Sequence, residues 1–223
     1  MVFEGMIVIM SAPMIYELRR PKRIIPNKKY PALFLIHGKG SNEHNMFDLV
    51  SGLEKDFFIF SVRGHIPQPP GYSFFTFKVY GQPDRGGFDE GIKLISRFID
   101  YALEEYPIDA TSLYFLGFSQ GAVISMTLAL TLGHKLKGIA ALSGYIPQFV
   151  LEEYDRKPVD GLSVFISHGE KDPVLPYQWG VAAQEYFNEM NASVSFYSYQ
   201  EGHIISLKNQ EDFTIWLHND LKH

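Results

Sequence analysis

The chain has 223 residues, and its hydrophobic content of 46% is enough for one globular domain over residues 1–223 with a substantial core. A net charge of -5, from 20 basic and 25 acidic side chains, provides no basic surface for nucleic acid and no attraction to an anionic membrane. The absence of cysteine excludes disulfides, thiolate metal sites and a cysteine nucleophile.

The N-terminal residues predict edge strands and no targeting segment. Apolar runs at Met6–Met10 and Met14–Leu18 are separated by Ser11-Ala12-Pro13, which favours a short hairpin. No basic residue precedes these runs, and Glu4 and Glu17 interrupt them, unlike in a signal peptide. The longest apolar runs are far shorter than a membrane span. We therefore expect a cytoplasmic protein without membrane insertion.

Short apolar runs without alternation predict strands that are covered on both faces. In chain order, these runs are Ala32–Ile36, Phe57–Val62, Leu113–Leu116, Ile139–Leu142 and Val164–Ile166. A further strand is predicted at Ser193–Tyr199, where polar and apolar residues alternate.

Helical patterns lie between and after these strands. Apolar residues at a spacing of about 3.6 predict a helix over Ile92–Leu103, with Asp89 and Glu90 near its start, where carboxylates favour the helix dipole. Further helices are predicted at Gln120–Leu132, Tyr177–Met190 and Leu207–Leu221. Strands that alternate with helices indicate an α/β fold: a mostly parallel central sheet flanked by helices on both faces. Ligands of such sheets bind at the carboxyl ends of the strands.

One long segment, Arg63–Gly87, reads as irregular because prolines and glycines break it, and it carries aromatic residues around Phe74 and Phe75. Irregular segments of this length inside a compact domain are usually functional loops. One interpretation is that aromatic residues of this segment form an apolar wall that binds the acyl chain of a substrate, with Phe74 and Phe75 as the main candidates beside Tyr72, Phe77 and Tyr80. The other is that the loop packs on its own aromatic side chains.

The pentapeptide Gly117-Phe118-Ser119-Gln120-Gly121 matches the pattern G-x-S-x-G between a predicted strand and a predicted helix. A serine at such a sharp turn has a strained backbone, and small neighbours let the turn close against adjacent elements. The start of the following helix favours negative charge there. The pattern therefore predicts Ser119 as a nucleophile, and the alternative is a tight turn that merely contains serine.

A serine nucleophile requires a base and an acid that orients the base. His203 lies in the loop after the last predicted strand, at a carboxyl end of the sheet, and is the candidate base. Asp172 follows the preceding strand and is the candidate acid, with Glu170 as the local rival. His168 ends that same strand, and we interpret it as a structural residue. The order Ser, Asp, His fits this kind of fold.

The remaining part of such a site is a pair of backbone N–H groups that bind the oxyanion. The N–H after the nucleophile, on Gln120, is one candidate donor, and the loop after an early strand supplies the other. Ile36-His37-Gly38-Lys39-Gly40 is that loop, and its glycines allow close approach of the backbone to a ligand. A plain glycine-rich turn or a weak phosphate cradle are the alternatives, although no P-loop or dinucleotide pattern is present.

Several segments together resemble the phospholipase/carboxylesterase group of α/β-hydrolases, which includes acyl-protein thioesterases and bacterial carboxylesterases. The resemblance runs from about Tyr30 to the C-terminus and rests on LIHGKGSNE (35–43), LGFSQGA (116–122), LSG (142–144), SHGEKDPVLP (167–176) and EGH (201–203). It implies Ser119 as nucleophile, Asp172 as acid, His203 as base, and the N–H groups of Lys39 and Gln120 as oxyanion donors. The segment HGKGSNE is more similar to the bacterial carboxylesterases than to the thioesterases.

The resemblance implies a serine hydrolase of the α/β-hydrolase fold that cleaves a small-molecule carboxylic ester through an acyl-enzyme, with no metal or organic cofactor. About twenty residues separate Ile139–Leu142 from Val164–Ile166, which is the length of one crossover and leaves no room for a separate cap domain. A thioesterase or lysophospholipase with the same triad, and a non-catalytic binding protein on this scaffold, remain alternatives. The sequence is also compatible with a homodimer.

Overall fold

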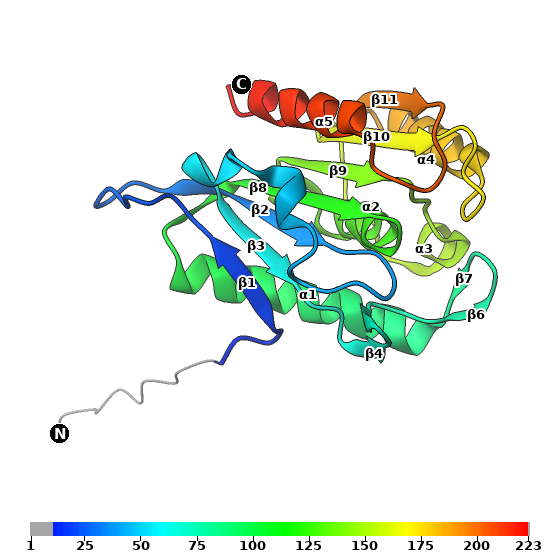
Figure 1. Cartoon of the computed structure of the whole chain (residues 1–223), viewed down its shortest axis with the longest axis horizontal. Helices are drawn as coiled ribbons and strands as arrows, with labels where there is room; N and C mark the ends of the chain where they lie inside the picture. The colour runs from blue at the N-terminus through cyan, green and yellow to red at the C-terminus, as the bar shows by residue number, and fades with distance from the viewer. Residues whose placement is uncertain (1–10, 223) are drawn as a thin grey trace.

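The computed structural model describes residues 11–222, which form a sheet of seven strands in the order β1-β3-β2-β8-β9-β10-β11 (Figure 1). Its strands are β1 (Tyr16–Arg19), β2 (Tyr30–Ile36), β3 (Phe58–Val62), β8 (Ile108–Phe118), β9 (Gly138–Leu142), β10 (Ser163–Gly169) and β11 (Ser193–Tyr199). Strand β1 is antiparallel to β3, and the other strands run parallel to their neighbours. The prediction of a mostly parallel central sheet is therefore confirmed.

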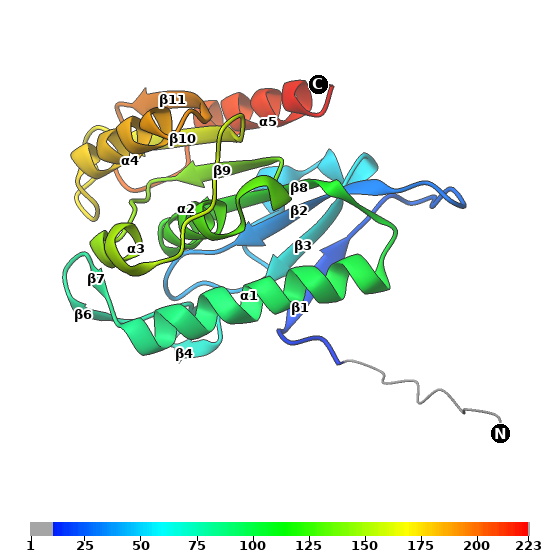
Figure 2. The same ribbon diagram turned by 180° about the vertical axis from the view of Figure 1, so that it is seen from behind.

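Helices cover both faces of the sheet, as the opposite views in Figures 1 and 2 show. They are α1 (Arg85–Glu105), α2 (Gln120–Leu132), α3 (Gln148–Glu153), α4 (Tyr177–Glu189) and α5 (Leu207–Asp220), with short 3-10 turns η1 (Phe47–Val50), η2 (Leu53–Lys55) and η3 (Gly133–Lys135). Side chains of α1, α2 and α4 join the core on one face, and those of η1, η2 and α5 join it on the other. Within residues 11–222, no helix combines the length and apolarity needed to cross a membrane.

Strand β2, in the interior of the sheet, shows why a continuous apolar run predicts a strand that is covered on both faces. Ala32, Phe34 and Ile36 belong to the core on one face, whereas Leu33 and Leu35 belong to the core on the other. All five side chains are buried, because successive residues of a strand point to opposite faces and both faces carry helices.

Two elements differ from the sequence prediction. Helix α1 begins at Arg85 rather than near Ile92, and the side chain of Asp84 caps it by accepting a hydrogen bond from Gly87 N at 3.2 Å. Asp89 therefore lies inside the helix and pairs with Arg85. At the N-terminus, the run Met14–Leu18 corresponds to β1, while its predicted hairpin partner, Met6–Met10, lies outside the described residues.

The segment Arg63–Gly87 is not irregular throughout, so that prediction is wrong in part. It contains one hairpin of β4 (Ile66–Gln68) and β5 (Gly71–Ser73), and a second of β6 (Phe77–Val79) and β7 (Gln82–Pro83). Strands of two or three residues are too short to produce a recognisable alternation of polarity. Between β9 and β10, the described chain forms only the short helix α3, with no separate cap domain.

Candidate active site

Ser119 lies at the turn between β8 and α2 with a strained backbone, at φ 56° and ψ -116°. Neighbouring elements hold this conformation in place. Its N–H donates to the carbonyl oxygen of Leu142 at the end of β9, at 2.9 Å, and its own carbonyl accepts from the N–H groups of Ala122 and Val123 in α2. The turn therefore fixes the hydroxyl at the carboxyl edge of the sheet.

The glycines on either side of Ser119 allow this turn to close. A Cβ atom added to Gly117 would lie 2.1 Å from the carbonyl oxygen of Gly121, and one added to Gly121 would lie 1.8 Å from the carbonyl oxygen of Ile36. Both contacts are to backbone atoms of packed elements, which cannot move aside as a flexible side chain would.

Substitution of Gly121 by alanine is expected to lower the free energy of unfolding by about 3 kcal/mol or more, at the upper end of overpacking costs. Urea denaturation followed by circular dichroism measures this. Gly86→Ala is the matched control, because a Cβ at Gly86, in the first turn of α1, meets only a side-chain oxygen of Asp84 at 3.4 Å. Equal stability of the two variants would contradict the steric role of Gly121.

The structure brings the three predicted triad residues together from loops that follow β8, β10 and β11. His203 Nε2 lies 2.8 Å from Ser119 Oγ, and His203 Nδ1 lies 2.6 Å from Asp172 Oδ2. The other carboxylate oxygen, Oδ1, accepts hydrogen bonds from the N–H groups of Val174 and Leu175 at 2.8 and 2.9 Å. With β9 between β8 and β10, the strands β8-β9-β10-β11 run parallel, so the carboxyl ends of β8, β10 and β11 lie at one edge of the sheet.

The environment of Asp172 favours its ionised form. Burial alone would raise the pKa of this carboxyl, but the N–H groups of Leu175 and Val174 and the ring of His203 together lower the pKa below its usual range. The carboxylate is therefore charged at neutral pH and accepts the Nδ1–H of His203. This arrangement leaves Nε2 of a neutral His203 free to accept the proton of Ser119.

The two rival residues have other contacts. His168 is buried, with Nε2 at 3.0 Å from the carbonyl oxygen of Leu175 and 3.4 Å from Asp172 Oδ2. Burial lowers the pKa of His168, which favours the neutral ring. Glu170 is exposed and accepts a hydrogen bond from the side chain of Gln200. Neither contact involves Ser119.

The loop after β2 packs directly against the turn that carries Ser119. A Cβ atom at Gly38 would lie 3.4 Å from Ser119 Cβ, and Lys39 follows immediately. Gln120 is the first residue of α2, so its N–H has no carbonyl one turn earlier in the helix to bind. The Gln120 side chain is already engaged, since it accepts from Phe74 N at 3.1 Å and donates to Phe75 O at 2.7 Å.

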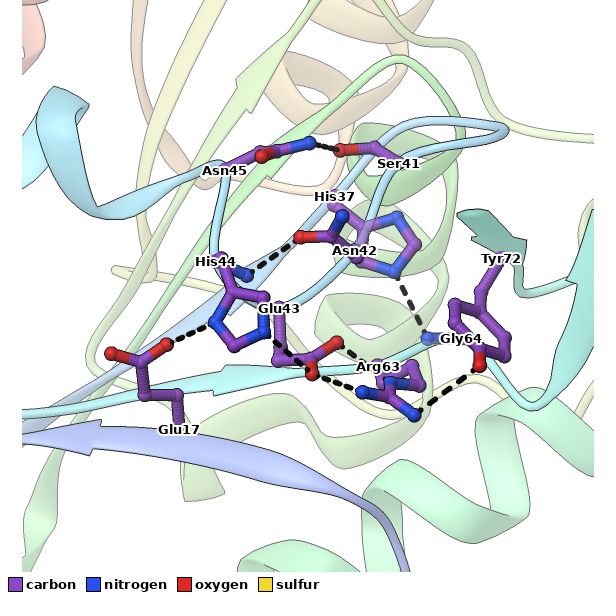
Figure 3. Close-up of polar contacts among 10 residues, drawn as sticks. All are labelled: Glu17, His37, Ser41, Asn42, Glu43, His44, Asn45, Arg63, Gly64 and Tyr72. Carbon is purple, nitrogen blue, oxygen red and sulfur yellow. Dashed lines mark hydrogen bonds and ion pairs between the residues drawn. The ribbon is translucent and has the colours of Figure 1, made fainter. Parts of the chain in front are cut away.

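His37 anchors the beginning of this loop (Figure 3). The N–H of Gly64, in the loop after β3, donates to His37 Nε2 at 3.0 Å, which requires that nitrogen to be unprotonated. Nδ1 then carries the hydrogen and donates it to the carbonyl oxygen of Gly38 at 2.7 Å. Burial lowers the pKa of His37, in agreement with a neutral ring.

Acidification is expected to lower the free energy of unfolding because His37 and His168 are buried as neutral rings. Their pKa values in the folded chain lie below the ordinary 6.5, so the unfolded chain binds protons first. Their contribution to stability is therefore complete above about pH 6.5 and is lost as the pH falls toward the folded-state values. Urea unfolding from about pH 8 to about pH 5 measures this, spanning the range in which histidine titrates. The double variant His37→Gln/His168→Gln should show a weaker pH dependence, and an unchanged dependence would contradict the assignment.

The interpretation of Phe74 and Phe75 as a wall that binds the acyl chain is wrong in this structure. Their exposed fractions are 0% and 1%, so neither side chain reaches a cavity. The ring of Phe74 packs on His37 at 4.8 Å between centroids, and that of Phe75 packs on Phe88 at 5.2 Å. The two rings thus pack into the core of the domain, because burying two large rings stabilises the fold more than exposing them.

Two cavities flank the loop that carries Asp172. One, of about 400 Å³, adjoins Ser119 and His203 and is lined by Gly38, Lys39, Ser41, Asn45, Met46, Leu49, Phe118, Val174 and Ile205. The other, of about 370 Å³, is lined by Tyr80, Gly81, Gln82, Tyr145, Ile146, Gln148, Leu151, Trp179, Ala182, Ala183 and Tyr186. The hydroxyl of Tyr80 donates to the carbonyl oxygen of Val174, so this contact lies between the two cavities.

Of the aromatic residues that line the second cavity, Tyr80 was among the predicted wall residues, whereas Tyr145, Trp179 and Tyr186 were not predicted from the sequence. Tyr145 follows the carboxyl end of β9, a position at which the rule for parallel sheets places ligands, and that rule was the available signal. Trp179 lies in the first turn of α4, where nothing in the sequence pattern distinguishes it from a core residue.

Comparisons with known proteins identify the family of this chain. Residues 24–218 match the family described as Phospholipase/Carboxylesterase. The chain is 28% identical over 184 residues to the putative hydrolase MhqD of Bacillus subtilis, covering 82% of this chain and 90% of that protein. It is 26% identical over 220 residues to acyl-protein thioesterase 1 of Kluyveromyces lactis, covering 89% of this chain and 96% of that protein.

Solved structures of similar proteins include the carboxylesterase of Bacillus cereus, with a TM-score of 0.82 and 25% identity over 93% of this chain and 94% of that chain. The α/β-hydrolase fold expected from the sequence is confirmed by this similarity together with the parallel sheet. Because the family match extends over most of its length, the chain belongs to the phospholipase/carboxylesterase family and is a carboxylesterase-type hydrolase.

Proposed function

We propose that the protein cleaves carboxylic esters with Ser119 as nucleophile, His203 as general base and Asp172 as the acid that orients His203. The observation that carries the proposal is the continuous hydrogen-bonded chain from Ser119 Oγ through both ring nitrogens of His203 to Asp172, with distances of 2.8 and 2.6 Å. An Nδ1–H donated to Asp172 leaves the lone pair of Nε2 facing the serine hydroxyl, which is the tautomer that a general base needs.

The reaction proceeds through an acyl-enzyme. Ser119 Oγ bonds to the ester carbonyl carbon, its proton moves to His203 Nε2, and the carbonyl electron pair moves onto oxygen. The N–H groups of Lys39 and Gln120 donate to this oxyanion, each contributing on the order of 3 kcal/mol. Collapse of the intermediate breaks the bond to the alcohol oxygen, which takes the proton from His203. A water molecule, deprotonated by His203, then attacks the acyl group and restores Ser119.

Labelling with a fluorophosphonate probe tests the nucleophile. The wild type is expected to form one covalent adduct, which mass spectrometry locates on the peptide that contains Ser119, and Ser119→Ala is expected to form none. Ser198→Ala is the control, because Ser198 is an exposed serine on β11 and should leave labelling unchanged. Equal labelling of the wild type and Ser119→Ala would reject the assignment.

The aromatic cavity is the proposed site for an apolar part of the ester. Its lining contains no charged side chain, and the rings of Tyr80 and Tyr145 lie 5.3 and 4.6 Å from that of Trp179. The hydroxyl of Tyr145 is buried and has no hydrogen-bond partner among the described residues. Neutral acyl or alcohol groups with an apolar body therefore fit this cavity better than charged ones.

Trp179→Ala is expected to lower kcat/KM for esters with a long or aromatic group by about 10- to 100-fold, the equivalent of burying one large apolar group. Hydrolysis of an acetate ester of a small alcohol provides the internal control and should change by less than about threefold, because neither its acyl nor its alcohol group is large enough to need the cavity. Steady-state kinetics over a graded series of esters measures both values. An equal loss for short and long esters would show that the cavity does not select the substrate.

A thioesterase is the second candidate, favoured by the similarity to the acyl-protein thioesterase of Kluyveromyces lactis. An oxyester and a thioester that share the same acyl group discriminate between the two functions. A higher kcat/KM for the oxyester supports the carboxylesterase proposal, and the reverse ranking would assign the protein as a thioesterase.

A further inference from the structure

A partly buried ion pair, Glu43–Arg63, joins the loop after β2 to the loop after β3 (Figure 3). The loop after β2 carries the predicted oxyanion donor Lys39. Glu43, at the end of the loop after β2, is only 2% exposed. Its carboxylate accepts two hydrogen bonds from the guanidinium of Arg63, from Nε at 2.7 Å and from Nη2. Arg63 follows β3, the strand next to β2. Such a bidentate contact fixes direction as well as distance.

The same guanidinium also holds Tyr72 of β5. It lies over the Tyr72 ring at 4.5 Å from the centroid, and Nη1 donates to the Tyr72 hydroxyl at 3.3 Å. The backbone of Tyr72 pairs in turn with the loop after β2, accepting from Gly40 N at 2.8 Å and donating to Ser41 O at 2.7 Å. Arg63 therefore reaches the end of this loop through Glu43 and its middle through Tyr72.

The beginning of the loop is attached to the same segment. Gly64, the residue next to Arg63, donates its N–H to His37 Nε2, and His37 Nδ1 donates to the carbonyl oxygen of Gly38. Lys39 follows Gly38 directly and precedes the paired residue Gly40. The residues on both sides of Lys39 are thus held in place, Gly38 through His37 and Gly64, and Gly40 through Tyr72.

We propose that the Glu43–Arg63–Tyr72 network positions the Lys39 N–H group for the oxyanion, so that Glu43 and Arg63 are positioning residues for catalysis. This inference rests on the proposed function. A gain in stability alone is a poor explanation for the pair, because the desolvation of the buried Glu43 offsets part of the attraction and a pair with a partly exposed arginine adds little stability. A rigid bidentate contact that fixes the position of the Lys39 N–H affects the reaction rate directly, because a displacement of about 1 Å can lower the rate by about 100-fold.

The charges of the network agree with this role. The hydrogen bonds from Arg63 outweigh burial and hold the pKa of Glu43 below its usual range, so the pair is ionised at neutral pH. The network continues through the exposed ring of His44, which bridges Glu43 to Glu17 on β1. The loop after β2 is thereby connected to the edge strand β1 as well as to the loop after β3.

The test uses Arg63→Lys and Glu43→Gln in the full chain, because lysine cannot reproduce the fork and glutamine removes the charge at nearly constant volume. Each variant is expected to lower kcat for a neutral acetate ester by about 10- to 100-fold with KM changed by less than about twofold, as for loss of a contact made only in the transition state. The Ki of a trifluoromethyl ketone should rise by the same factor as kcat/KM falls, because the oxygen of its Ser119 hemiketal occupies the oxyanion position.

Arg85→Lys is the matched control. Arg85 also pairs with carboxylates, Asp89 and Glu153, and lies over an aromatic ring, that of Phe149 at 4.6 Å, but it belongs to α1 and not to either loop. It should leave kcat and Ki within about twofold of the wild type, as expected for an exposed ion pair away from the site.

Wild-type kcat and Ki in Arg63→Lys and Glu43→Gln would overturn the inference, as would a fall in kcat without a matching rise in Ki. If Arg63→Lys does not fold, Glu43→Gln decides alone, because it retains the side-chain volume and one acceptor oxygen. Failure of the proposed function is recognised separately: the wild type would then show no ester hydrolysis that depends on Ser119.

Discussion

Ser119→Ala is expected to lower kcat for ester hydrolysis by about 10⁴-fold or more, the loss typical of removing the nucleophile from a Ser-His-Asp triad. The fold should persist, because alanine and serine bear the same strain at φ 56° and the Ser119 backbone contacts with Leu142, Ala122 and Val123 do not involve the hydroxyl. Steady-state kinetics, with thermal unfolding to verify the fold, measures both properties.

Ser198→Ala should retain wild-type kcat and excludes a general effect of replacing a serine. A residual rate of Ser119→Ala within about tenfold of the wild type would show that catalysis uses another nucleophile, since such a loss is far smaller than a triad supplies.

Asp172→Asn is expected to lower kcat by about 10⁴-fold, because it favours the tautomer of His203 that cannot act as a general base. The N–H groups of Val174 and Leu175 bind Oδ1 of Asp172, so an asparagine will keep its carbonyl oxygen there and turn its NH₂ group toward His203 Nδ1. Nδ1 must then accept a hydrogen bond, the ring proton moves to Nε2, and Nε2 can no longer accept the proton of Ser119. The pH dependence of kcat and the melting temperature separate this effect from unfolding.

Glu170→Gln is the matched control, because Glu170 is the rival carboxylate two residues away and contacts Gln200 rather than His203. It should change kcat by less than about twofold, as for most exposed substitutions. A larger loss in Glu170→Gln than in Asp172→Asn would exchange the roles of the two acids.

The elements predicted well from the sequence are those whose burial is nearly complete. The predicted range Gln120–Leu132 coincides with α2, because the glycines near both ends of this apolar run indicate where the helix begins and ends. The start of α1 could not be placed, since Arg85-Gly86-Gly87 lacks both apolar spacing and helix propensity and is held by the Asp84 cap. The small hairpins β4–β5 and β6–β7 depend on tertiary pairing, which two or three residues of sequence do not encode.

In the candidate site, too, some residues could be predicted from the sequence and others could not. Ser119, Asp172 and His203 each follow a strand with a clear pattern, so chain order and sheet topology were enough to predict that they meet, while their roles remain predictions. The burial of Phe74 and Phe75 was not readable, because an aromatic residue looks the same in a pocket wall and in a core. The pairing of Glu43 with Arg63 joins two loops in three dimensions and leaves no periodic signal in the sequence.

The positions of the triad within the sheet have a consequence for how activity depends on local stability. Ser119 follows the central strand β8, whereas His203 follows β11, the edge strand, which pairs on one side only, with β10. Edge elements open at a lower free energy than the centre of a domain. Release of β11 would withdraw His203, the proposed base, while leaving the serine turn and the loop after β2 folded. Hydrolysis would then be lost on mild heating before most of the secondary structure melts, so catalytic activity reports on the C-terminal edge of the protein rather than on its core.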